Sequence, residues 1–178
     1  YEIPLRLVGS EMCIRDRFLR DEVGFETIKS KVVKPLNRKI AAYYGCLLLR
    51  PSKVMAFDNP ENPSLMEKFI EALGGTPVTY AFKNECCGAY QSVKNPELTK
   101  AKSRKILENA AAAGAAEIAT VCPLCHYNLK ENGGGALKVI DLPALICEAL
   151  GAECENRVTC AAAGKTCAAC GAAEGGNV

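Results

Sequence analysis

The chain has 178 residues, of which 49% are hydrophobic, so it holds enough apolar side chains for one domain with a substantial core. Its 22 basic and 20 acidic residues nearly cancel, and no basic run or aromatic platform supports binding to nucleic acid. The longest apolar stretch, residues 110–116, is far shorter than the roughly 18 residues that a membrane span needs, so we expect a soluble protein without direct membrane insertion.

The first 37 residues show little that is typical of a folded core. The string from Ser10 to Arg17 resembles an adapter read-through peptide found in translated environmental sequences, so we expect residues 1–17 to be non-native or disordered, with no role for Cys13. Residues 18–37 carry mixed charges and apolar side chains at helical spacing. We interpret them as a linker with one amphipathic helix that ends near Pro35.

From residue 38 to residue 151, short apolar runs alternate with helical patterns. The expected strands cover residues 39–44, 76–82, 117–121 and 137–142, and the expected helices cover residues 65–73, 96–113, 123–130 and 143–150. Asn95 before Pro96 is a typical helix start, and Gly74 with Gly75 is a typical helix end. This alternation predicts an α/β domain: a small open parallel sheet of about four strands, flanked by helices.

Residues 152–178 form a tail rich in Ala, Gly and Cys that lacks the large apolar residues needed for its own core. Its four cysteines have a spacing compatible with zinc or a small cluster, and a disordered or oxidisable end is an equal alternative. These residues are Cys154, Cys160, Cys167 and Cys170.

Eleven cysteines are the most distinctive feature of the composition. A disulfide scaffold is typical of small secreted domains with little core, whereas this chain has ample apolar residues and an odd number of cysteines. The adjacent pair Cys86-Cys87 is also poorly suited to bonding with itself, because such a disulfide is strained. Metal or cluster ligation is therefore favoured for the central domain.

Five cysteines fall just after predicted strands. Cys46 follows the first, Cys86 and Cys87 follow the second, and Cys122 and Cys125 follow the third. In an open parallel sheet the loops beyond the carboxyl ends of the strands share one edge, where ligands bind. We therefore predict a cluster site at that edge.

The local sequence around these cysteines suits metal ligation. Cys122-Pro-Leu-Cys125 places two sulfurs where a helix begins, which lowers the pKa of a thiol. Gly88 after the cysteine pair allows the backbone to approach a bulky cofactor. One zinc ion needs four ligands and a redox disulfide needs two, whereas an iron cluster can share five among several metal atoms.

Four segments of the chain resemble the CCG cysteine-rich domain family, over about residues 38–151. They are Tyr43-Tyr-Gly-Cys46, Asp58-Asn-Pro-Glu-Asn-Pro63, Glu85-Cys-Cys-Gly88 and Val121-Cys-Pro-Leu-Cys-His126. Within the family, the chain is most similar to the C-terminal such domain in the B subunit of heterodisulfide reductase. The resemblance implies an unusual non-cubane [4Fe-4S] cluster, whose ligands here are the five cysteines named above.

The same resemblance implies an activity and partners. Two such clusters flank the substrate disulfide and cleave it homolytically by one-electron steps, whereas this chain has one CCG module. We expect an iron–sulfur subunit of a reductase complex that acts on a small organic disulfide and takes electrons from flavin- or ferredoxin-type iron–sulfur subunits. The chain itself carries no glycine-rich fingerprint for a flavin or nicotinamide cofactor.

Two other functions stay open at this point. One is an electron-transfer subunit of a glycolate, lactate, glycerol-3-phosphate or fumarate oxidoreductase, and the other is a structural module that binds zinc through four of the cysteines.

His126, the single histidine, is either a proton donor beside the cluster or a polar helix residue. Lys83 and Lys94 flank the cysteine pair and either favour an anionic ligand or are solvated. Because thiolate ligands need a reducing environment, we expect a cytoplasmic protein, in an oxygen-avoiding host.

Overall fold

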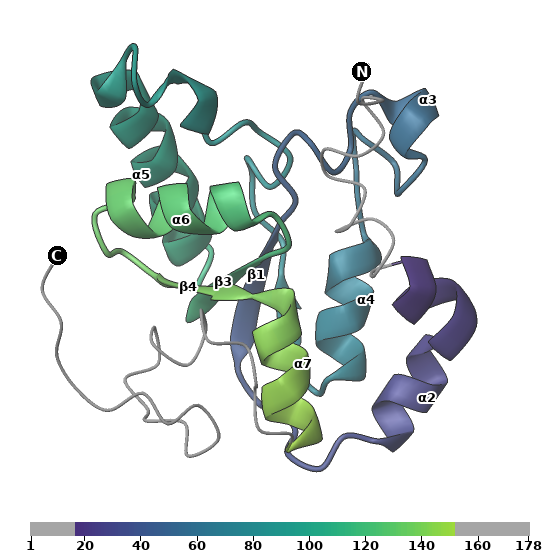
Figure 1. The fold of residues 1–178 in the computed structure, drawn as a ribbon. Helices are drawn as coiled ribbons and strands as arrows, with labels where there is room; N and C mark the ends of the chain where they lie inside the picture. Colours follow the sequence, from purple (N-terminus) through teal and green to yellow (C-terminus); the bar gives the residue numbers. More distant parts are fainter. Residues whose placement is uncertain (1–16, 152–178) are drawn as a thin grey trace, which may run out of the picture.

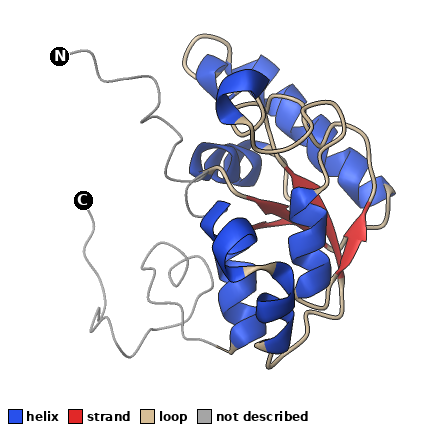
Figure 2. Cartoon of the chain, turned by 90° about the vertical axis from the view of Figure 1, so that its right-hand side faces the viewer, coloured by secondary structure: helices blue, strands red, loops and turns tan. Residues whose placement is uncertain are grey.

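Four parallel strands form the centre of the molecule, with the spatial order β2–β1–β3–β4 (Figures 1 and 2). They are β1 (Lys39–Tyr43), β2 (Thr76–Val78), β3 (Glu117–Thr120) and β4 (Lys138–Asp141). The computed structural model describes residues 17–151, so the expectations for residues 1–16 and for the four tail cysteines lie outside the described residues. The predicted open parallel α/β sheet is confirmed.

Helices cover both faces of the sheet, and each face has its own apolar core (Figure 1). One face packs against α2 (Phe25–Ser30), α4 (Leu65–Ala72) and α7 (Leu142–Leu150), and the other against α5 (Pro96–Ala112) and α6 (Pro123–Asn132). Alternate side chains of β1 explain this division, because Ile40 and Ala42 enter the first core whereas Ala41 and Tyr43 enter the second. A strand buried on both faces is apolar, as β1 is after its exposed first residue, Lys39.

The structure departs from the sequence prediction in the second strand. β2 ends at Val78 instead of residue 82. It is an edge strand that contains Pro77, which has no backbone N–H to donate to a neighbouring strand. Beyond β2 the chain leaves the sheet, and the Tyr80 hydroxyl donates to the carbonyl of Ala42 at 3.1 Å.

Three short helices were not predicted. They are η1 (Leu19–Val23), a π-helical turn; α3 (Ser52–Met55); and η2 (Ala89–Gln91), a 3₁₀ turn directly after the cysteine pair. The segment expected to hold one linker helix therefore holds two short ones, η1 and α2, separated by Gly24 with φ of 77°. This segment packs on the core, where the Phe25 and Phe69 rings meet edge to face at 4.9 Å.

The helices of residues 17–151 are short in relation to a lipid bilayer. None of them combines the length and the apolar character needed to cross a membrane.

Candidate cysteine site

Five cysteines meet beyond the carboxyl ends of β1, β2 and β3. Cys46 lies three residues after β1, the Cys86-Cys87 pair lies in the loop that links β2 to η2, and Cys122 directly precedes α6, whose first turn carries Cys125. The Sγ atoms of Cys87 and Cys125 are hydrogen-bonded at 3.7 Å, although 38 residues separate them in sequence. The topology thus brings together the sulfurs that the sequence placed at the ends of three strands.

The site has a buried side and an open side. Cys87, Cys122 and Cys125 are at most 5% exposed, whereas Cys46 and Cys86 are half-buried. All five are thiols rather than halves of disulfides. A bound group would therefore be shielded from water on one side and reachable on the other.

Contacts among the sulfurs change their proton affinities. A hydrogen bond with Cys125 lowers the pKa of Cys87 to about 6. Another hydrogen bond with Cys125 lowers the pKa of Cys122 to about 7, and backbone amides at the start of α6 lower it further. The pKa of Cys125 is raised, because its thiol shares its proton with these two neighbours. Burial raises the pKa of Cys46 to about 11. Two of the five sulfurs are thus prepared as thiolates near neutral pH, which is the form that binds metals.

The backbone of the Cys86-Cys87 loop is held by three side chains from three different elements. Tyr43 at the end of β1 donates its hydroxyl to the Glu85 carbonyl at 2.8 Å. Asn128 of α6 donates to the Cys87 carbonyl at 2.9 Å, and Thr99 of α5 donates to the Gly88 carbonyl at 3.0 Å. All three donors are buried, so the sulfurs of this loop are positioned before anything binds.

These three side chains were not identified from the sequence. Asn128 and Thr99 lie in helices whose polar residues mostly face water, and nothing in the local pattern distinguishes a buried polar residue from an exposed one. Burial of a polar group costs free energy unless it is hydrogen-bonded, which explains why each of them reaches a backbone carbonyl.

Gly45 brings the backbone close to the cysteines. It has φ of 66°, and a Cβ atom added to it would lie 3.0 Å from the Sγ of Cys125. A side chain here would press on the sulfur of Cys125, so the glycine lets this sulfur pack directly against the backbone.

We expect Gly45→Ala to displace Cys125 and lower the metal content of the purified chain by more than about half, because the new methyl group contacts its sulfur. The matched control is Gly135→Ala, which has a similar φ of 73° but no atom within 4 Å of the added Cβ. Both variants should lose about 1 kcal/mol of stability to backbone strain. Equal metal contents in the two variants would contradict the expectation.

His126 follows Cys125 on α6, and the structure supplies a partner that the sequence did not indicate. Its Nδ1 atom lies 2.9 Å from Oδ1 of Asp141, the residue that ends β4. Asp141 is far from the cysteine motifs in sequence, but β4 pairs with β3 in parallel, so its carboxyl end reaches the same edge of the sheet.

The two lysines beside the cysteine pair have different surroundings. Lys83 forms an ion pair with Glu67 at 2.8 Å and donates to the Pro63 carbonyl, with both charged side chains less than one-fifth exposed. It therefore anchors the loop to α4, whereas Lys94 is exposed.

Comparison with known proteins identifies the family. The family model described as the CCG cysteine-rich domain matches residues 40–130, which are 91 of the 178 residues and include all five cysteines. The chain belongs to the CCG cysteine-rich domain family. The resemblance noted in the sequence is therefore confirmed.

Several curated proteins share this CCG domain. The chain is 38% identical over 113 residues to the B subunit of the ferredoxin/F(420)H(2)-dependent CoB-CoM heterodisulfide reductase of Methanosarcina acetivorans, over 61% of this chain and 37% of that protein. It is 40% identical over 106 residues to the 8-methylmenaquinol:fumarate reductase membrane anchor subunit of Wolinella succinogenes, over 58% of this chain and 37% of that protein. The chain thus spans little more than a third of the length of these relatives.

A third relative is the B subunit of the ferredoxin:CoB-CoM heterodisulfide reductase of Methanosarcina mazei, which is 35% identical over 113 residues, again over 61% of this chain and 37% of the relative. By their names, all three relatives are subunits of reductases.

The cysteines of the CCG domain have the chemistry of an iron–sulfur site, because cysteine thiolates are the usual ligands of such clusters. The lowered pKa values of Cys87 and Cys122 and the grouping of five thiols agree with this chemistry. Within residues 17–151, no three His, Cys, Asp or Glu side chains are placed so that they could hold one metal ion as they stand.

Tyr90 on η2 lies at the open side of the site and was also missed from the sequence. Its side chain is 62% exposed, and its pKa is raised, first by partial burial and then by the nearby Cys46 and Cys122. It is thus a residue that a molecule approaching the cysteines would meet.

Proposed function

We propose that this chain is an iron–sulfur redox module of a heterodisulfide reductase, or of a related enzyme that reduces an organic disulfide. The observation that carries the proposal is the convergence of five cysteine thiols at one edge of the sheet in a CCG domain. Relatives that are named as heterodisulfide reductase subunits support the choice of substrate class.

The proposed ligands are Cys46, Cys86, Cys87, Cys122 and Cys125, and the proposed group is a non-cubane [4Fe-4S] cluster, which when bound would supply one-electron chemistry toward a disulfide. The remaining work is done by the chain. Tyr43, Asn128 and Thr99 fix the loop of the cysteine pair, and the buried sulfurs exclude water from the inner side. The half-buried Cys46 and Cys86 leave the outer side accessible to a substrate.

The proposed partners follow from the limits of the module. The chain has one CCG domain and spans little more than a third of its relatives, so we propose that a second module and flavin- or ferredoxin-type iron–sulfur subunits complete the enzyme. We also propose a cytoplasmic location in an oxygen-avoiding host, because the five thiolates need reducing conditions.

Metal and sulfide analysis tests the proposal. The full chain is purified or reconstituted without oxygen, and we expect about four iron atoms and four sulfides per chain, with a brown colour. Reduced viologen should then drive reduction of a small organic disulfide when the partner subunits are present. One zinc ion per chain without sulfide would refute the proposal and leave a structural zinc module.

A second candidate function is electron transfer in a fumarate-reductase-type complex, without direct contact between this module and the substrate. The observation that favours it is the 40% identity to the fumarate reductase subunit of Wolinella succinogenes. The same preparation separates the two functions, because this alternative predicts four irons per chain but no reduction of any organic disulfide.

His126 remains our proposed proton donor beside the cluster, with the Asp141 carboxylate next to its ring. Reduction of a disulfide consumes protons, and an imidazole beside a carboxylate is a common proton donor in enzymes. We expect His126→Gln to lower kcat for disulfide reduction about tenfold or more, while iron and sulfide contents stay unchanged. Full turnover in this variant would show that His126 is only a polar residue of α6.

A further inference from the structure

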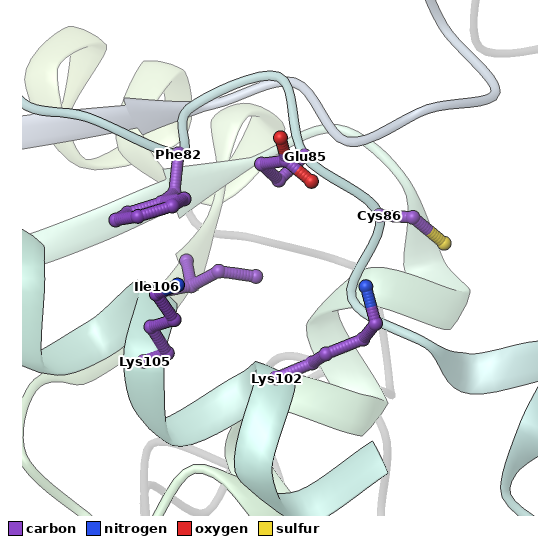
Figure 3. Close-up of a pocket in the computed structure, with 6 residues that line it drawn as sticks. All are labelled: Phe82, Glu85, Cys86, Lys102, Lys105 and Ile106. Atoms are coloured by element: carbon purple, nitrogen blue, oxygen red, sulfur yellow. The ribbon is translucent and has the colours of Figure 1, made fainter. Parts of the chain in front are cut away.

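A small cavity lies against the cysteine pair, between its loop and α5 (Figure 3). Its volume is about 200 Å³, and it is lined by Phe82, Glu85, Cys86, Lys102, Lys105 and Ile106. Sites that hold a whole small molecule are usually about 300–1,000 Å³. This cavity is therefore large enough for one end of a ligand, with Cys86 in its wall.

The charge of the cavity is positive. Two lysines of α5 line it, against the single carboxylate of Glu85. In the described part of the chain neither Lys102 nor Lys105 has a carboxylate partner, unlike Lys83 and Lys100, which are paired with Glu67 and Glu97. Two ammonium groups thus face a small space without their own counter-ions.

Lys102 is held in place by the glycine of the CCG motif. A Cβ atom added to Gly88, whose φ is 81°, would lie 3.2 Å from Cδ of Lys102. The aliphatic stem of Lys102 therefore packs across the loop where a side chain is missing, and its ammonium group points toward the segment that carries Cys86 (Figure 3). Gly88 thus serves this lysine as well as the turn.

Lys105 is held by an aromatic ring. Its Nζ atom lies 4.4 Å from the centre of the Phe82 ring, a typical cation–π distance. Phe82 itself has φ of 69°, a left-handed conformation that is rare for a bulky residue. Phe82 and Ile106 also give the cavity an apolar wall suited to a short carbon chain.

We propose that this cavity is a subsite for the anionic end, a carboxylate or a similar oxyanion, of the molecule that reacts beside Cys86. The two ammonium groups bind the charge, and the apolar wall accepts the carbon chain that leads toward the sulfur atoms. The identity of the ligand as a disulfide rests on the proposed function above. The anion subsite itself rests only on the cavity and its lysines.

The test compares a charged and a neutral disulfide. Binding of dithiodipropionate and of bis(hydroxyethyl) disulfide to the full chain is measured by calorimetry without reductant. We expect the dianion to bind more tightly, and combined Lys102→Met and Lys105→Gln to raise its Kd about tenfold while the Kd of the neutral disulfide changes less than about twofold. Methionine preserves the stem that packs on Gly88.

Two variants serve as controls. Lys100→Gln removes one positive charge from the same helix but outside the cavity, and it should change the Kd of the dianion less than about twofold. Lys102→Arg keeps the charge and should retain tight binding. Equal weakening by Lys100→Gln, or unchanged binding in the double variant, would overturn the subsite. The subsite would also be overturned if the double variant shifted the midpoint potential of the proposed cluster but bound the dianion as before. The lysines would then act on the cluster and not on a ligand.

Iron and sulfide contents are measured for every variant, so that the two proposals fail separately. Dianion binding that depends on the lysines in a chain holding only zinc would uphold the anion subsite and reject the disulfide-reducing function. If the double variant reduced disulfides at the same rate as the unchanged chain, the subsite would be rejected and the proposed function upheld.

Discussion

Replacing Cys125 with alanine is expected to reduce the iron content from about four atoms per chain to fewer than about one. Cys125 is the sulfur at the centre of the site, since it contacts both Cys87 and Cys122 and packs against Gly45. Its loss removes a proposed ligand and also the hydrogen bonds that lower the pKa values of its two neighbours. Iron, sulfide and the visible spectrum of anaerobically purified protein provide the measurement.

The control for this prediction is Cys147→Ala. Cys147 is half-buried on α7 and lies outside the three loops that form the site. The substitution removes one sulfur from the same domain and should leave iron and sulfide unchanged. If both variants lose iron equally, or if Cys125→Ala keeps its full content, the five-cysteine assignment is wrong.

Asn128→Ala is expected to lower the free energy of unfolding by about 3 kcal/mol. Asn128 donates to the Cys87 carbonyl and, at 3.1 Å, to the hydroxyl of Ser103, and it is only 2% exposed. Alanine leaves both acceptors buried without this donor and frees the loop of the cysteine pair. Urea unfolding of the metal-free chain measures the stability, and iron content after reconstitution should fall as well.

A neighbouring asparagine on α6 gives the matched control. Asn132 donates to the side-chain oxygen of Asn128 at 2.8 Å and is half-buried. Asn132→Ala removes one hydrogen bond at the edge of the network, so we expect a loss of about 1 kcal/mol and full iron content. Similar effects in the two variants would show that Asn128 has no special role in holding the cysteine loop.

Local patterns were sufficient for most strands and long helices of the domain. Apolar runs predicted β1, β3 and β4 to within about two residues at each end, and Asn95 with Pro96 marked the start of α5 correctly. The end of β2 was wrong, because Pro77 and the turn toward Tyr80 override a favourable strand composition. The placement of the cysteines after three strands followed from the general geometry of parallel sheets.

The chain's sequence by itself determined the α/β class and the edge of the sheet at which five cysteines converge, because each depends on short-range periodicity and on a topological rule. Only the tertiary structure decided which side chains support those cysteines. Asn128 and Thr99 act across 41 and 11 residues of sequence, and Asp141 lies beside His126 because β4 pairs with β3. Lys102 lines the same cavity as Cys86 because α5 lies against Gly88. Such contacts arise from packing between distant elements, which leaves no periodic signal in the amino-acid sequence.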